Sequence, residues 1–202
     1  MVMKIDLSKA YNMVDWGLLR MILYKIGLGR ASVNWIMGCV TNTSMAIIIN
    51  VKKSSFFKPG RGLRQGCALS PLLFILVMDS LSFKINNEVI LGNIKGIKLS
   101  HCREISHNFF VDDVMPFGML IRLVWKNYHE IFQRFEKASR MMANIGKSCV
   151  FYEEEWRVLA IDIASMFNLC TALLSMGFKY MGFHMKTNNY RSKDWEWLVV
   201  KV

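Results

Sequence analysis

Hydrophobic and polar residues alternate over the first residues of the chain and then recur at helical spacing. The pattern predicts strands over residues 3–7, 45–51 and 147–152, and helices over residues 13–27, 30–42, 70–86 and 121–143. The first helix is amphipathic, and its apolar side is expected to face the core. That side is formed by Val14, Leu18, Met21 and Ile22. Gly27 stands near its end.

Turn and proline positions refine this picture. Pro71 falls in the first turn of the third helix, where its missing N–H costs nothing. Residues 94–111 suggest short strands with a hairpin closing at Asp112 and Asp113, and residues 178–185 suggest another hairpin. Helices interleaved with an antiparallel sheet predict an α+β fold in a single domain over residues 1–202.

Asp112 and Asp113 are the most informative residues, because they end the apolar run 108–111. Adjacent carboxylates repel, and burying them is costly unless a cation is present. Hard oxygen ligands favour Mg²⁺, so the pair is a candidate metal site. The alternative is a strand that ends in a tight turn with both carboxylates solvated.

Two other segments carry candidate chemistry. Asp6 follows an apolar residue in the first strand. Residues 59–66 form a glycine-rich loop with Arg61 and Arg64 that leads into an apolar helix, an arrangement typical of phosphate binding. Asp6 and Asp112 are 106 residues apart, so spacing alone does not bring them together.

The order of these segments resembles the reverse transcriptases of non-LTR (LINE-type) retrotransposons, especially the plant ones. Residues 4–11 resemble motif A, residues 62–71 motif B and residues 110–113 motif C. Residues 135–148 resemble motif D and residues 179–183 motif E, the primer grip. The resemblance spans nearly the whole chain and implies a reverse-transcriptase palm, an antiparallel sheet packed with helices that lacks most of the fingers and the thumb.

The resemblance implies two-metal nucleotidyl transfer from a deoxynucleoside triphosphate to a primer 3′-hydroxyl, on an RNA or DNA template with a DNA primer. Asp6 and Asp112 would hold two Mg²⁺ ions, with Asp113 assisting. Residues expected near the nucleotide are Leu7 and Ser8 through their N–H groups, Tyr11 as a steric gate, and Arg64, Gln65, Gly66 and Lys147. The primer grip would comprise Lys179, Tyr180, Met181, Gly182 and Phe183.

Simpler roles stay open for several of these residues. Tyr11 is also a candidate for core packing, and Arg64 for an exposed surface cation. Lys147 is also explained by the preference of lysines for helix ends. The primer-grip segment is also consistent with an ordinary amphipathic strand pair.

The family's fingers, thumb and preceding endonuclease segments do not occur within these 202 residues. A palm alone is expected to have little or no polymerase activity. Asn12 stands where the family usually has a second aspartate, and Pro116 falls where an aliphatic residue is usual. A non-catalytic nucleic-acid-binding remnant and an inactive retroelement relic are therefore alternative hypotheses.

Charge and cysteine usage add two expectations. Residues 1–103 hold 14 Lys/Arg against 4 Asp/Glu, which favours binding to a phosphate backbone, although a basic solvated surface gives the same count. The five dispersed cysteines form no C-x-x-C pair and indicate reduced intracellular thiols. No secretory or membrane-spanning segment is expected, and DNA synthesis at a chromosomal target would require access to the nucleus.

Overall fold

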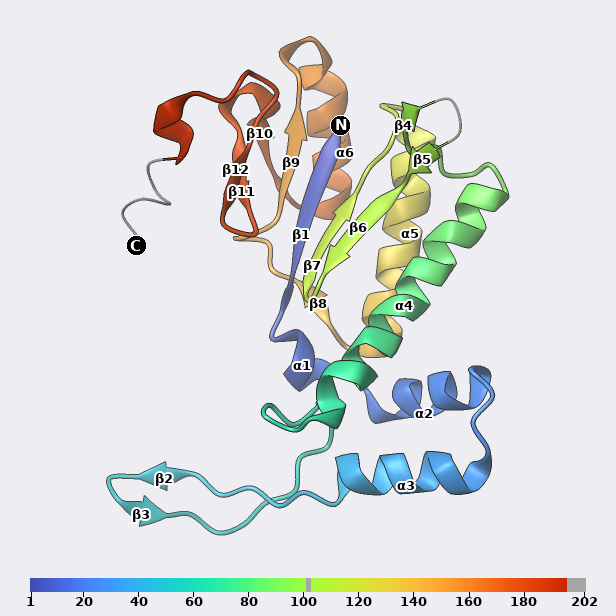
Figure 1. Ribbon diagram of the computed structural model, residues 1–202, viewed down its shortest axis with the longest axis vertical. Coiled ribbons are helices and arrows are strands. Elements are labelled where there is room, and N and C mark those ends of the chain that lie inside the picture. Colours follow the sequence, from blue (N-terminus) through green and yellow to red (C-terminus); the bar gives the residue numbers. More distant parts are fainter. Residues whose placement is uncertain (101–102, 196–202) are drawn as a thin grey trace.

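A six-stranded sheet organises the chain in the computed structural model, which describes residues 1–100 and 103–195. Its strands run in the order β10-β9-β1-β7-β6, with β8 also paired to β1 (Figure 1). Their bounds are β1 Val2–Ser8, β6 His107–Phe110, β7 Asp113–Pro116, β8 Met142–Ala143, β9 Cys149–Tyr152 and β10 Cys170–Leu173. Every pair is antiparallel except β9 with β10. The mixed architecture confirms the predicted α+β fold.

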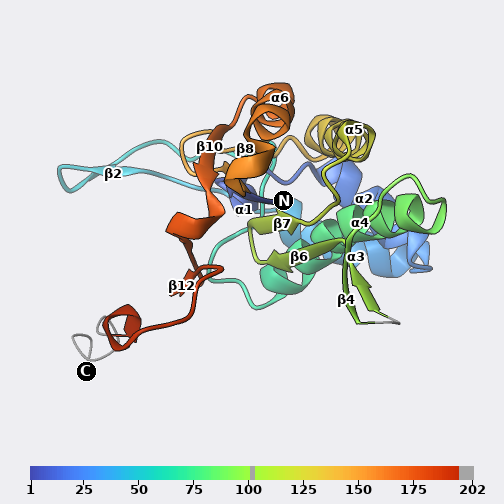
Figure 2. The same ribbon diagram turned by 90° about the horizontal axis from the view of Figure 1, so that it is seen from above.

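Helices cover one face of this sheet and a hairpin covers part of the other. Figure 2 shows α5 and α6 on the side of the sheet opposite to the β11–β12 hairpin. The helices are α1 Ala10–Met13, α2 Trp16–Lys25, α3 Arg30–Thr41, α4 Leu69–Ile90, α5 Arg122–Ser139 and α6 Arg157–Phe167. The two remaining strand pairs near the sheet are β4 Ile97–Ser100 with β5 Arg103–Ile105, and β11 Phe178–Tyr180 with β12 Phe183–Met185. Short 3-10 turns occur at Glu154–Trp156, Leu174–Met176 and Ser192–Trp195.

The alternation along β1 decides which side chains face the core. Met3, Ile5 and Leu7 are buried, whereas the even-numbered residues between them are only partly buried. Side chains on a strand alternate between faces, so the odd residues face the helices and the even residues share the opposite face, called here the open face. Asp6 therefore lies on the open face with Lys4.

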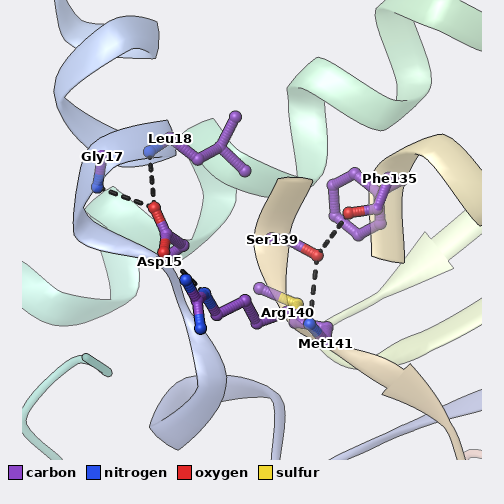
Figure 3. A network of polar contacts seen from close by, with 7 residues as sticks. All are labelled: Asp15, Gly17, Leu18, Phe135, Ser139, Arg140 and Met141. Atoms are coloured by element: carbon purple, nitrogen blue, oxygen red, sulfur yellow. Dashed lines mark hydrogen bonds and ion pairs between the residues drawn. The ribbon is translucent and has the colours of Figure 1, made fainter. Parts of the chain in front are cut away.

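A polar network joins α2 to the end of α5 (Figure 3). The Asp15 carboxylate accepts hydrogen bonds from the N–H groups of Gly17 and Leu18 at 2.8 and 3.0 Å, which caps α2. Arg140, just after α5, donates to the same carboxylate at 2.9 Å. The buried Ser139 hydroxyl donates to the Phe135 carbonyl at 2.7 Å, and the Ser139 carbonyl accepts from the Asp15 N–H at 3.1 Å. The cap therefore fixes the start of α2 against the end of α5, which leads into residues 140–148, called here the motif D loop.

The predicted helix over residues 13–27 is wrong at its start. The chain forms the short α1 first and turns at Val14 and Asp15 before α2 begins. The buried stripe of α2 is Leu19, Ile22 and Leu23, and Met21 is 53% exposed, contrary to the expected apolar side.

The segment over residues 45–51 does not form the predicted strand. The strand is reduced to β2 Ile48–Ile49, which pairs with β3 Lys52–Lys53 in a hairpin that projects from the body of the protein (Figure 1), and Met45 adds an isolated bridge to Phe57. Their side chains are exposed, so no sheet face covers the isoleucines. Strand propensity alone extends a strand little when no neighbour buries its face.

Helices α4 and α5 differ from the extents predicted for them, 70–86 and 121–143, because α4 continues to Ile90 and α5 ends at Ser139, before β8. The helix α4 is 22 residues long, and its length and apolar composition would suffice to cross a bilayer. Core helices share that composition, and α4 buries seven residues against the rest of the protein. The apolar stretch after residue 157 forms α6, a helix that the pattern left unassigned.

The predicted turn at Asp112 and Asp113 lies one residue earlier. Strand β6 ends at Phe110, residues 111 and 112 form the turn, and Asp113 already belongs to β7. Val111 has a φ of 55°, a conformation unfavourable for a β-branched residue, and it is 49% exposed. Pro116 is accommodated because it is the last residue of β7, opposite His107.

Candidate active site

Asp6 and Asp113 lie directly opposite each other on the antiparallel strands β1 and β7. Directly opposed residues have Cβ atoms about 4.5–5.5 Å apart on the same face of a sheet. Two acidic side chains that the sequence separates are thus neighbours on the open face. Each is about one-fifth exposed, at 19%.

Burial raises the pKa of the Asp113 carboxyl, and the nearby Asp6 and Asp112 carboxylates add to this effect. The Lys4 ammonium opposes it from 3.5 Å. The Oδ1 atom of Asp113 is buried and has no hydrogen-bond partner among the residues that the structure describes. An anionic oxygen in this state is a suitable ligand for a hard cation.

Asp112 takes a different place from the other two aspartates. It lies in the turn, and its carbonyl accepts a hydrogen bond from the Leu7 N–H at 3.0 Å. Within residues 1–100 and 103–195, no three His, Cys, Asp or Glu side chains gather closely enough to hold a metal ion. The structure pairs Asp6 with Asp113 and leaves Asp112 in the adjoining turn, whereas the sequence-based expectation made Asp6 and Asp112 the main ligands.

The Leu7 contact corrects one sequence-based expectation. Its N–H group is already bonded to Asp112, and its side chain is buried in the core. The Leu7 N–H is thus not available to a triphosphate in this structure. Ser8, at the end of β1, lies opposite Met142 of β8.

The motif D loop encloses the main chain of Asp6. The Asp6 N–H donates to the buried Ser148 hydroxyl at 3.0 Å, and the Asp6 carbonyl accepts from the Asn144 N–H at 2.7 Å. The Lys147 ammonium lies 4.0 Å from the Asp6 carboxylate, and this lysine is 68% exposed. The structure thus brings Lys147 to Asp6, as a site role requires.

The motif B loop is bonded to the last residue of motif A and to the segment that follows it. The N–H groups of Gly62 and Leu63 donate to the carbonyls of Val14 and Tyr11 at 2.8 and 2.7 Å. A side chain at Gly62 would collide with the backbone of Asn12, so only glycine fits there at its φ of 89°. The backbone of Asn12 thus has a packing role, whereas its side chain is exposed.

Tyr11 and the loop residues occupy different environments. The Tyr11 ring stacks on Phe74 of α4 with centroids 4.3 Å apart, so the packing role is present. Arg64, Gln65 and Gly66 are exposed. At the start of α4, the Leu69 N–H, with smaller effects from Ser70 and Arg64, lowers the pKa of Cys67. This end of the helix therefore favours negative charge.

The predicted primer-grip hairpin is present and packs on the open face. Met181 and Gly182 form its two-residue turn with φ values of 53° and 88°. Phe178 stacks on Phe151 of β9 with centroids 4.2 Å apart. Lys179, Met181 and Phe183 are exposed, as residues that contact a partner must be.

Tyr180 connects this hairpin to the motif C strands. It is 7% exposed, and its hydroxyl accepts a hydrogen bond from the Asn108 amide at 3.2 Å. Burial raises the pKa of Tyr180, and the Asp113 carboxylate raises it further. The hairpin is thus fixed beside the aspartate pair.

Sequence reasoning missed three residues of this arrangement, which are Lys4, Asn108 and Ser148. The signal for Lys4 was available, because it precedes Asp6 by two residues on a strand and so shares its face. No local signal identifies Asn108 or Ser148, whose partners lie 72 and 142 residues away.

Four cysteines are free thiols, and Cys102 lies outside the described residues.

Curated proteins similar to this chain come from retrotransposable elements and a plant mitochondrion. A Pol polyprotein from type-1 retrotransposable element R2 of Popillia japonica is 25% identical over 114 residues. The match covers 56% of this chain and 18% of that protein. An uncharacterized mitochondrial protein of Arabidopsis thaliana is 40% identical over 70 residues, which cover 34% of this chain and 57% of that protein.

Solved structures of telomerase share the fold. Telomerase from Candida albicans, in complex with a fragment of telomeric RNA, superposes with a TM-score of 0.57 at 10% identity. The match covers 73% of this chain and 27% of that one. Apo telomerase from Candida tropicalis gives a TM-score of 0.56 at 11% identity, over 73% of this chain and 29% of that chain.

The reverse transcriptase (RNA-dependent DNA polymerase) family profile matches residues 1–185, nearly the whole chain. The matched segment contains the aspartate pair, the motif B loop, the motif D loop and the primer-grip hairpin. The chain therefore belongs to the reverse transcriptase family.

Proposed function

We propose that this chain is the palm segment of an RNA-directed DNA polymerase of a LINE-type non-LTR retrotransposon. The observation that carries the proposal is the placement of Asp6 opposite Asp113, whose buried Oδ1 has an ion pair with Lys4 but no hydrogen bond within residues 1–100 and 103–195. The family match and the R2 relatives support the polymerase class.

Asp6 and Asp113 would hold Mg²⁺ on the open face, with Asp112 joining them from the turn. When bound, two such ions lower the pKa of a primer 3′-hydroxyl and neutralise the leaving pyrophosphate. The residues themselves would supply position and charge, which account for most of the rate in phosphoryl transfer.

The neighbouring elements would place the substrates. The β11–β12 hairpin would hold the primer end beside Asp113, through Lys179, Met181 and Phe183 around the buried Tyr180. The exposed Arg64, Gln65 and Gly66 would contact the incoming deoxynucleoside triphosphate and the template at the electropositive start of α4. Ser8 and Tyr11 would border the nucleotide, and Lys147 would donate a proton to pyrophosphate.

Single-nucleotide addition to an RNA-templated DNA primer tests this function. The purified chain is expected to give trace Mg²⁺-dependent addition at high protein concentration, and Asp6→Asn or Asp112→Asn should abolish it. Equal addition by these variants would contradict the proposal. Robust extension over many nucleotides would contradict the expectation that a palm alone has little activity.

A second candidate is a non-catalytic nucleic-acid-binding role inside the cell, with access to the nucleus. It is favoured by the exposed cations of residues 52–64, a stretch without acidic residues: Lys52, Lys53, Lys58, Arg61 and Arg64. This candidate predicts RNA or DNA binding that weakens with salt and survives Asp6→Asn. Intact binding without any nucleotide addition by the wild-type chain would favour it.

A further inference from the structure

Lys4 lies at the aspartate pair although no motif assigns it a role. Its ammonium is 3.5 Å from Asp113 Oδ1, the buried oxygen that has no hydrogen bond in the described part of the chain. The Lys4 side chain is 20% exposed, so water screens this ion pair less than it screens a surface pair. Lys4 is also two residues from Asp6 on β1, which places both side chains on the open face.

The surroundings make Asp113 the anionic partner of Lys4. Cys149 of β9 stands opposite Lys4 on the other side of β1. Burial raises the pKa of this thiol, and the neighbouring Cys170 raises it further, so the thiol is neutral at physiological pH. The second lysine of the site, Lys147, lies farther from its aspartate, at 4.0 Å, and is 68% exposed. Lys4 is therefore the main compensation for two opposed carboxylates.

We infer that Lys4 is a counter-ion that a divalent cation must displace from the Asp6–Asp113 pair, so that this lysine sets the cation affinity of the site. A divalent cation held by Asp113 Oδ1 would bind the oxygen that the Lys4 ammonium now faces. The ammonium beside the same oxygen repels such a cation and has to move away. This inference rests on the proposed metal-binding function and adds a residue that regulates it.

Removing the Lys4 charge therefore has two opposite effects. Without a metal ion, the carboxylates lose their compensation, and the protein becomes less stable. With a metal ion, the competitor is gone, and the site binds more tightly. A residue that merely packs, or that holds Asp113 in place for the metal, would not produce tighter binding.

The test is a Mg²⁺ titration of the full chain, read by the rise in its thermal unfolding midpoint. Lys4→Met is expected to lower the midpoint without metal and to lower the apparent Kd for Mg²⁺ three- to tenfold. Lys4→Arg keeps the charge and should retain the wild-type Kd. Lys126→Met removes an exposed lysine of α5 on the far side of the sheet and should change neither value.

The outcomes distinguish the existence of the metal site from the role of Lys4 at that site. Wild-type binding with an unchanged or weaker Kd in Lys4→Met overturns the role of Lys4 alone. Absence of Mg²⁺ binding in both proteins overturns the metal site and the role of Lys4 together. Binding by Lys4→Met with little or none by the wild type supports both. Should Lys4→Met not fold, Lys4→Gln, which keeps a polar side chain, carries the same prediction.

Discussion

Asp6 and Asp113, distant in the sequence, stand directly opposite each other on β1 and β7. The main chain of Asp6 is hydrogen-bonded to Ser148 and Asn144 of the motif D loop. The neighbouring Leu7 is hydrogen-bonded to the motif C turn. The pairing of the two strands and these loop contacts therefore assemble the site from motifs A, C and D together.

Replacing Asp113 by Asn should lower single-nucleotide addition roughly 100-fold or more, because a lost metal ligand removes several kcal/mol of charge stabilisation. Glu154→Gln, an exposed acid away from the open face, is the matched control and should retain the wild-type rate. The rate of single-nucleotide addition, measured with a labelled nucleotide, tests this prediction. Equal rates for Asp113→Asn and the control would remove Asp113 from the site.

The bond between Asn108 and Tyr180 should couple the primer-grip hairpin to the motif C strands. Tyr180→Phe and Asn108→Ala are each expected to weaken binding of a primer–template about fivefold, the effect of one hydrogen bond of about 1 kcal/mol. The double variant should be no weaker than either single one, because both changes remove the same bond. Fluorescence anisotropy at low salt measures the Kd.

Tyr24→Phe removes an exposed hydroxyl from α2 and should leave that Kd unchanged. Additive effects of the two substitutions at Asn108 and Tyr180 would show that the bond does not couple the elements.

Ser148→Ala should destabilise the protein by about 1–2 kcal/mol, because it removes the buried hydroxyl that accepts a hydrogen bond from the part-buried Asp6 N–H. Urea unfolding of the variant and the wild type gives the difference in their free energies of unfolding. Ser165→Ala removes an exposed hydroxyl from α6, and its effect should stay within about 0.5 kcal/mol. Similar losses at both positions would argue against a special role for Ser148.

The Asp15 cap gives a prediction about pH. Hydrogen bonds from the Leu18 N–H, and further effects of the Gly17 N–H and Arg140, lower the pKa of Asp15 from 3.8. The folded state therefore binds the proton less tightly than the unfolded state, and the stabilisation is present above the unfolded pKa. It is lost as the pH falls through the folded pKa.

Asp15→Ala should cost about 1 kcal/mol at neutral pH, because the α2 cap is lost. Asp15→Asn keeps a capping oxygen and should cost less. Thermal unfolding between pH 7 and strongly acidic pH should show the difference between wild type and Asp15→Asn shrink below the unfolded pKa. A difference that grows in acid would contradict the direction of the pKa shift.

Periodic segments were predictable from sequence because burial imposes their pattern. The alternation of β1 and the positions of α3, α4 and α5 were expected in this way. The strand predicted over residues 45–51 forms only at Ile48–Ile49, with a bridge at Met45, because its isoleucines are exposed on a projecting hairpin. The division between α1 and α2 depends on the Asp15 cap, which competes with the apolar spacing that suggested one helix.

Within the site, residue types were predictable but partners were not. The motifs identify Asp6, Asp113 and Tyr180, whereas the register of β1 with β7 decides which aspartates face each other. The positive φ of Val111 shifts the turn by one residue. The pattern of a hydrophobic run carries no information about the backbone angle of a single residue.

Counting bound Mn²⁺ tests the central claim most directly. Electron paramagnetic resonance of free Mn²⁺ gives the number of ions that the purified chain removes from solution. Binding of up to two ions by the wild type, lost when Asp6, Asp112 and Asp113 are all replaced by Asn, is the predicted result. Equal Mn²⁺ binding by the wild type and the triple variant would contradict a metal site at these aspartates.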